Sequence, residues 1–106
     1  MELVREKSQT PAKGARPLPR QEAEKLAREV PTWTLTDGRL EEEFHFSDFD
    51  EAMRFVSRVA RIAKEEDHHP DIAVSYNKVH LTLSTHSIGG LSRNDFIVAA
   101  KIERLL

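Results

Sequence analysis

Cysteine is absent from the 106 residues, and this absence excludes three kinds of chemistry. A chain without thiols has no disulfide framework, no zinc site built on thiolates and no cysteine nucleophile. Long apolar runs are also lacking, because the longest stretch without Asp, Glu, Lys or Arg, Val79 to Ser92, contains several His, Thr and Ser residues. It falls short of the roughly 18 apolar residues that a membrane helix needs, so we expect no membrane partner.

An excess of either charge is missing as well, since 16 Lys and Arg residues against 18 Asp and Glu residues leave a net charge of -2. No run of like charge is long enough to attract a polyanion, so no nucleic-acid partner is expected. The N-terminus has no apolar signal core, which favours a cytoplasmic location. A chain of this length forms one domain and buries a modest fraction of its surface, which favours self-association.

The N-terminal region, residues 1–18, has a composition that does not bury enough surface to order itself, with Pro, Gly, Lys and Arg and no apolar period. We therefore predict a flexible N-terminal tail over 1–18 and a single domain over 19–106. A helix is predicted to begin at Pro19 and to end before Pro31. Its apolar residues recur at steps of three and four: Ala23, Leu26, Ala27 and Val30.

A first hairpin is predicted over residues 32–46, where apolar and polar residues alternate on both sides of Asp37-Gly38. Glu42 breaks the alternation, so either the second strand begins later or this position lies at an exposed edge.

A second hairpin is predicted over residues 72–83, with Asn77-Lys78 as a two-residue turn. This turn would pair Ile72 with Leu83 and, extended outward, would bring His69 beside His86.

Two further helices complete the predicted fold. The longer begins at Ser47, with Asp50 completing a helix-start box, and carries Phe55 and Ile62 beside an apolar stripe. The stripe residues are Phe49, Ala52, Met53, Val56, Val59, Ala60 and Ala63. The last helix begins at Ser92 and Asp95 with the same spacing. The order α-β-β-α-β-β-α predicts an α+β fold, a four-stranded antiparallel sheet with three helices on one face.

Histidine is the residue type that clusters: His68, His69, His80 and His86 fall within nineteen consecutive positions. Histidines at the end of a helix also favour its negative pole, so the pair His68-His69 has a purely structural alternative. From spacing alone, Asp67 is equally an ordinary exposed acid, and Ser84 and Thr85 are equally routine strand or turn hydrogen-bonding residues. These alternatives stay open at the level of the residues.

The histidines do not form a recognisable metal or hydrolase motif. There is no His-Glu-x-x-His pattern and no Gly-x-Ser-x-Gly turn, which argues against a metal site and against a serine hydrolase. Acid–base catalysis without a cofactor or a metal remains, and histidine suits it because it exchanges a proton near pH 7.

Three separated blocks carry a family resemblance: Glu-Asp-His-His-Pro70, then Tyr-Asn-Lys-Val-His-Leu-Thr-Leu-Ser-Thr-His86, then Gly-Gly-Leu-Ser-Arg-Asn-Asp95. Their order and spacing resemble the pterin-4a-carbinolamine dehydratases. The resemblance extends back through the long helix to Trp33 and covers the chain from about residue 18 to its end.

The resemblance implies dehydration of 4a-hydroxytetrahydrobiopterin to quinonoid dihydropterin and water, which recycles tetrahydrobiopterin after aromatic amino-acid hydroxylation. By resemblance, His68, His69 and His86 are the catalytic and orienting residues, with the acid and base work assigned to His68 and His86. Asp67, Ser84 and Thr85 would complete the pterin pocket. For Asp95, which belongs to the same pattern, we expect helix capping rather than catalysis.

The chain departs from the family pattern at two positions, where Ile72 replaces a usual Trp and Lys64 a frequent acid. If that Trp packs against the pterin, affinity falls, and Lys64 leaves open whether Glu65 or Glu66 tunes the histidines instead. The resemblance also implies a homodimer or homotetramer and a functional link to an aromatic amino-acid hydroxylase. The alternatives are a non-catalytic protein-binding module of the transcriptional coactivator type, and a dehydratase that acts on a different pterin.

Overall fold

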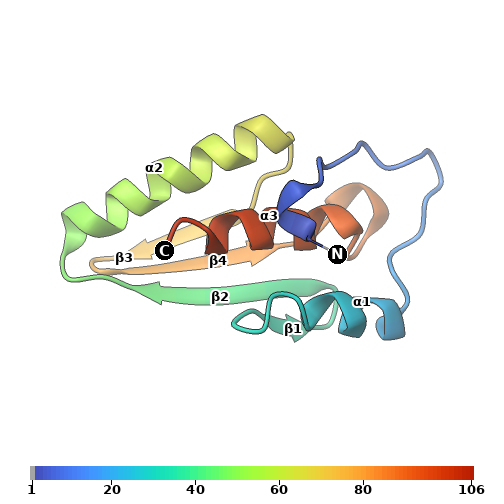
Figure 1. Cartoon of the computed structure of the whole chain (residues 1–106), viewed down its shortest axis with the longest axis horizontal. Coiled ribbons are helices and arrows are strands. Elements are labelled where there is room, and N and C mark those ends of the chain that lie inside the picture. Colours follow the sequence, from blue (N-terminus) through green and yellow to red (C-terminus); the bar gives the residue numbers. More distant parts are fainter. Residues whose placement is uncertain (1) are drawn as a thin grey trace.

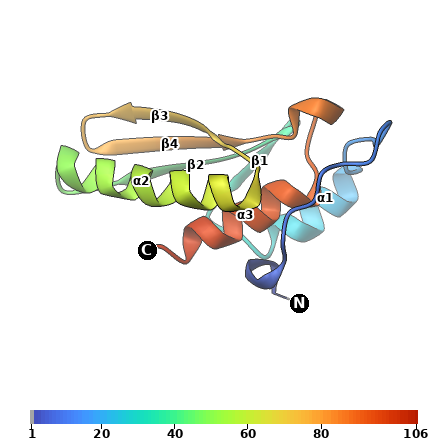
Figure 2. The same cartoon turned by 90° about the horizontal axis from the view of Figure 1, so that it is seen from above.

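The structure, a computed structural model, describes residues 2–106 and confirms the predicted α+β class. A single antiparallel sheet has the strand order β1-β2-β4-β3, and the three α-helices lie on one of its faces (Figure 1, Figure 2). The strands are β1 Thr34–Thr36, β2 Arg39–His45, β3 Asp71–Ser75 and β4 Lys78–Leu83. The helices are α1 Arg20–Ala27, α2 Phe49–Glu66 and α3 Arg93–Glu103, with short 3-10 helices η1 Leu3–Arg5 and η2 His86–Ile88. None of these described helices is long and apolar enough to cross a membrane.

The first hairpin forms as predicted, with Thr36 opposite Arg39 across the Asp37-Gly38 turn. Glu42, however, lies neither before the strand nor at an exposed edge. It is half-buried in the middle of β2, on the same side of the strand as Leu40 and Phe44. Burial, together with the nearby Glu103 carboxylate, raises the pKa of Glu42 to about 8. Both alternatives for Glu42 were therefore wrong.

The second hairpin turns one residue earlier than predicted, at Tyr76-Asn77, so that Ser75 pairs with Lys78. Tyr76 has a left-handed φ of 52°, and the Asn77 side chain donates a hydrogen bond to the carbonyl oxygen of Phe46 at 2.9 Å. This tertiary contact joins the turn to the end of β2. The Asn-Lys dipeptide alone gives no sign of such a contact.

The change of turn shifts the β3–β4 register by two residues. Ile72 lies opposite Leu81 rather than Leu83. Continuing the ladder beyond Asp71 and Thr82 would bring His69 opposite Ser84. The predicted pairing of His69 with His86 was therefore wrong, although a shift of two residues keeps each side chain on its expected face.

Helix α2 begins one residue later than predicted, because the Asp48 side chain, rather than that of Ser47, accepts the hydrogen bond from the Glu51 amide. Its buried face is centred on Phe55 and Val59, whereas Phe49 and Met53 are 46% and 38% exposed. Phe55, placed beside the stripe by sequence, is thus in its middle. One edge of the predicted stripe faces away from the core.

Helix α3 is the buried centre of the fold, and its predicted start at Ser92 is confirmed by a complete capping box with Asp95. The run from Phe96 to Ala99 is buried. In the helical layer, α3 lies between α1 and α2 (Figure 1, Figure 2). Asp95 therefore enters the core at the first turn of this helix.

Residues 2–18, over which a flexible tail is predicted, lie against the domain at both ends of this stretch. Leu3 in η1 is 2% exposed and joins the core cluster beside α3, and the Leu18 amide donates to the carbonyl oxygen of Leu91 at 2.8 Å. Between these contacts the chain passes the end of α2 and then loops outward (Figure 1). The division into tail and domain stays a prediction.

Candidate functional site

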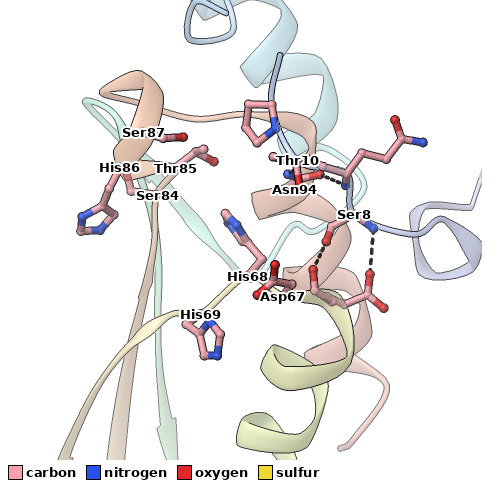
Figure 3. A pocket seen from close by; sticks show the side chains of 13 residues that line it. Ser8, Thr10, Asp67, His68, His69, Ser84, Thr85, His86, Ser87 and Asn94 are labelled. Atoms are coloured by element: carbon pink, nitrogen blue, oxygen red, sulfur yellow. Dashed lines mark hydrogen bonds between the residues drawn. The ribbon is translucent and has the colours of Figure 1, made fainter. Parts of the chain in front are cut away.

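A pocket of about 280 Å³ opens where α2 ends and where β4 leaves the sheet. All six residues predicted from the sequence line it: Asp67, His68, His69, Ser84, Thr85 and His86. They come from two segments, the connection between α2 and β3 and the stretch that follows β4 (Figure 3). A cavity of this size is at the small end of the range for ligand sites, so it suits one compact molecule.

The end of α2 determines where the two adjacent histidines lie. Asp67 caps the helix in the left-handed conformation, with φ 50° and ψ 43°, and the His68 amide donates back to the carbonyl oxygen of Ala63 at 3.1 Å. Among residues other than glycine, aspartate is one of the few that tolerate this conformation. The reversal turns His68 inward, with its side chain only 11% exposed, and leaves His69 exposed.

His68 is bound to a buried carboxylate. Its Nε2 lies 2.5 Å from Oδ1 of Asp95, which is fully buried at the start of α3. Because a carboxylate only accepts, the proton of this hydrogen bond belongs to Nε2. In the neutral ring, Nδ1 is then the nitrogen that carries the lone pair and accepts a proton.

Asp95 is itself held in place by two donors on its other oxygen. Oδ2 accepts from the Thr85 hydroxyl at 2.8 Å and from the Ser92 amide at 2.9 Å. Thr85 is 4% exposed, and its hydroxyl also lies 2.7 Å from that of Ser92. Asp95 is therefore a helix cap, as predicted, and also a positioning group for His68, which the sequence analysis missed.

The other side of the pocket is open. His69 and His86 are exposed, and their imidazole rings make no hydrogen bond to any residue in the described range 2–106. Figure 3 shows the three imidazole rings spaced apart rather than in contact. The Ser84 hydroxyl donates to the carbonyl oxygen of Gly38 at 2.9 Å, so it fastens the β1–β2 turn to the end of β4.

Glu66 forms part of the lining beside the end of α2. Burial alone would raise its pKa, but hydrogen bonds from Lys101 Nζ at 2.6 Å and from the Ser8 amide at 2.8 Å outweigh that cost and lower the pKa. Neither its carboxylate nor that of Glu65 bonds to a histidine among the described residues, so the carboxylate beside His68 is Asp95.

Residues outside the predicted set complete the lining: Ser8, Gln9, Thr10, Pro11, Ser87 and Asn94. Ile72 is not among the lining residues and is 39% exposed on β3. Within residues 2–106, no group of three His, Asp or Glu side chains is arranged to hold a metal ion.

Known proteins resemble this chain over most of its length. Residues 16–105 match the family model described as pterin 4 alpha carbinolamine dehydratase. A Nitrosomonas eutropha protein named "Putative pterin-4-alpha-carbinolamine dehydratase" is 46% identical over 94 residues, 88% of this chain and 83% of that protein. A Rubrobacter xylanophilus protein of the same name is 43% identical over 107 residues, 99% of this chain and 100% of that protein. A Brucella melitensis crystal structure titled "transcriptional coactivator/pterin dehydratase" has a TM-score of 0.80 at 30% identity, covering 85% of this chain and 98% of that one.

Proposed function

The chain belongs to the pterin 4 alpha carbinolamine dehydratase family, and from this premise we propose that it dehydrates 4a-hydroxytetrahydrobiopterin to quinonoid dihydropterin and water. The observation that carries the proposal is His68, fixed by a buried carboxylate at the wall of a pocket that His69 and His86 also line. Such a pocket offers three imidazoles, and imidazole is the side chain best suited to acid–base catalysis.

The reaction needs one proton delivered and one removed. The C4a–O bond breaks as the departing hydroxyl takes a proton and leaves as water. The proton on N5 passes to a base, and its electron pair forms the N5=C4a double bond. No electrons are exchanged with a cofactor, so an acid and a base held on the two sides of the substrate are sufficient for the step.

The geometry supports a division of labour between the histidines. His68 is the base, because Asp95 keeps the proton on Nε2 and leaves the Nδ1 lone pair to accept the proton from N5. Asp95 also supplies the charge that stabilises the imidazolium formed in that step. His86 is the acid, and its exposed position lets it recover a proton from water between turnovers. His69 orients the substrate, and Asp67 adds a hydrogen-bonding group at the rim.

Stopped-flow absorbance of 4a-hydroxytetrahydrobiopterin, generated in situ, tests the proposal directly. We expect micromolar protein to accelerate dehydration, and a parallel sample with a chelator to show the same rate, since none of the proposed steps requires a metal. A folded sample that leaves the spontaneous rate unchanged would refute the activity. Comparison of kcat/KM for substrates that differ in the C6 side chain then tests which pterin is preferred.

An exposed apolar surface supports the accompanying proposal of a homodimer or homotetramer. Met53 on α2 and Ile72 and Val74 on β3 are 38%, 39% and 37% exposed, although they are large apolar residues. β3 is also an edge strand, with one side unpaired in the sheet. We expect light scattering to show an oligomer, and Met53→Glu with Val74→Lys to give monomers. A monomeric wild-type protein at micromolar concentration would contradict this.

The cellular role proposed is the recycling of tetrahydrobiopterin in the cytoplasm beside an aromatic amino-acid hydroxylase. The pocket favours this enzymatic role over a protein-binding module of the coactivator type, because a module that binds through its surface has no use for a carboxylate buried behind His68. Slower hydroxylase turnover in a reconstituted system lacking this protein would support the role, and unchanged turnover would oppose it.

A further inference from the structure

One side of the pocket is formed by a segment from the opposite end of the chain. We call residues Glu6 to Pro11 the N-terminal strap. The strap follows η1, which Leu3 fixes in the core, and it passes the ends of α2 and α3. Farther along, Pro17 lies so close to Gly90 that a Cβ at Gly90 would be 2.8 Å from the Pro17 ring. The segment is therefore attached on both sides of the strap.

Three of the contacts that hold the strap are formed with the ends of α2 and α3. The Glu6 carboxylate accepts two hydrogen bonds from the Arg93 guanidinium, both at 2.6 Å, and this pairing lowers the pKa of Glu6. A bidentate, charge-assisted pair of this kind is stronger than an ordinary surface ion pair. Because Arg93 is the first residue of α3, the pair fixes the strap to the helix that also carries Asp95.

The other two contacts lie beside the pocket. The Ser8 hydroxyl donates to the carbonyl oxygen of Glu66, whose carboxylate accepts from the Ser8 amide. The Asn94 side chain pairs with the backbone of Gln9, accepting from its amide at 2.9 Å and donating to its carbonyl oxygen at 2.6 Å. Glu66 and Asn94 are both buried, so these are well-protected hydrogen bonds.

These contacts place Thr10 at the edge of the pocket with an unused hydroxyl. Thr10 lines the pocket, and its side chain makes no hydrogen bond to any other residue in the range 2–106. In Figure 3 the strap residues Ser8 and Thr10 lie on one side of His68, and Ser84 to Ser87 lie on the other. Thr10 thus lies on the opposite side of His68 from Ser84 to Ser87, at the edge of the same pocket.

The strap lies outside the part of the chain that defines the family. The family model begins to match at residue 16, whereas the strap ends at Pro11. The alignment with the Rubrobacter xylanophilus protein covers 99% of this chain and so runs through the strap. The strap therefore lies outside the region that the family model matches, although at least one relative has residues that align with it.

We propose that the N-terminal strap is a fixed wall of the pterin site and that Thr10 is a substrate-binding residue that sets affinity rather than rate. The inference rests on the proposed function. A pterin presents amide and amine groups along its pyrimidine edge, and a hydroxyl both donates and accepts, so Thr10 suits that edge. The reacting atoms C4a and N5 belong to the histidine side, which is why the strap is expected to act on KM and to leave kcat nearly unchanged.

Substitutions of Thr10 test the contact. Thr10→Val removes the hydroxyl and keeps the shape, and we expect KM to rise about three- to tenfold, the worth of one hydrogen bond, with kcat within about twofold of wild type. Thr10→Ser restores the hydroxyl and should return KM to near the wild-type value. Calorimetric binding of 7,8-dihydrobiopterin, a stable pterin, should weaken in parallel in Thr10→Val.

A variant that loosens the strap tests whether the strap forms a fixed wall of the pocket. Glu6→Ala removes the pair with Arg93 without touching the pocket lining, and Glu24→Ala, which removes the exposed pair with Arg20, is the matched control. We expect faster hydrogen exchange at the amides of Ser8 and Gln9 and a higher KM in Glu6→Ala, with neither change in Glu24→Ala. Melting temperatures check that both variants are folded.

The outcomes separate this inference from the proposed function. Wild-type turnover together with equal KM values in Thr10→Val, Thr10→Ser and wild type would overturn the role of Thr10 and leave the dehydratase standing. Pterin binding that weakens in Thr10→Val without any wild-type turnover would support the strap and refute the activity. Neither turnover nor pterin binding by the wild-type protein would overturn both.

Discussion

The two sides of the candidate site are built on different principles. On the buried side, Asp95 receives hydrogen bonds from His68, Thr85 and Ser92, and each of its two oxygens has at least one partner. On the open side, His69 and His86 are exposed and no described residue fixes their rings. The buried side is organised before a substrate arrives, whereas the open side can adjust to the substrate and exchange protons with water.

Removal of His68 should therefore have the largest effect on catalysis. We expect His68→Ala to lower kcat by about 10³-fold, within the range that a general base contributes. The control is His45→Ala, because His45 is exposed at the far end of β2 and pairs only with Glu43 among the described residues. Equal kcat values for the two variants, measured by stopped flow, would show that the buried side is not the catalytic one.

Loss of the charge behind His68 should have the next largest effect. Asp95→Asn keeps the size of the side chain and its capping ability, and we expect kcat to fall roughly 10- to 100-fold, as is usual when the partner of a functional histidine is lost. KM should change less than twofold, because Asp95 does not reach the open pocket.

Ser92→Ala is the comparison for Asp95→Asn. It removes the N-cap hydroxyl of α3, which should lower the free energy of unfolding by about 1 kcal/mol. It leaves the contact between Asp95 and His68 intact, so kcat should stay near the wild-type value. If Ser92→Ala lowered kcat as much as Asp95→Asn does, Asp95 would be acting through stability rather than through His68.

For the open side of the pocket we predict a smaller effect, and one on KM rather than on kcat. We expect His69→Ala to raise KM about two- to tenfold, the cost of a lost hydrogen bond to substrate, with little change in kcat. His69→Gln, which keeps a hydrogen-bonding group, should recover part of the affinity. A collapse of kcat in His69→Ala would move His69 into the proton-transfer step and erase the distinction between the two sides.

The features that the sequence predicted are those that depend on neighbouring residues. The Asp37-Gly38 turn, the capping box of Ser92 and Asp95 and the period of α2 are local patterns, and they fix the order of elements. The second turn was misplaced because Asn77 bonds to Phe46, 31 positions away.

The same limit applies to the site. His68, His69 and His86 were found through motifs, and all three line one pocket. The bond between His68 and Asp95 joins residues 27 positions apart, and a cap with a second oxygen turned into the core has no signature of its own. The N-terminal strap was missed because its contacts use backbone groups and single side chains, which create no period.

Glu42, a carboxyl group outside the pocket, tests whether hydrogen-bond donors are what make the buried side of the site stable. Glu42 is half-buried, as a counterpart to Asp95, but it faces Glu103 rather than a set of donors. The Thr32 hydroxyl lies 3.1 Å from Glu42 Oε1 and 2.8 Å from Glu103 Oε1, and with a single proton it donates to only one of them. Burial and this like charge raise the pKa of Glu42 to about 8, from 4.5.

The native state therefore holds a proton that the unfolded chain has released between about pH 4.5 and pH 8. Since stability falls with pH wherever the native state binds more protons, the melting temperature should decrease across this interval as Glu42 is forced to ionise. Glu42→Gln should flatten the decrease, and Glu43→Gln, at the exposed neighbouring position, should keep it. The contrary result is a wild-type melting temperature that stays level from pH 5 to pH 8, with the same behaviour in Glu42→Gln. It would mean that burial costs the Glu42 carboxylate no more than it costs Asp95. The number of hydrogen-bond donors around each carboxyl group would then not explain the difference between them.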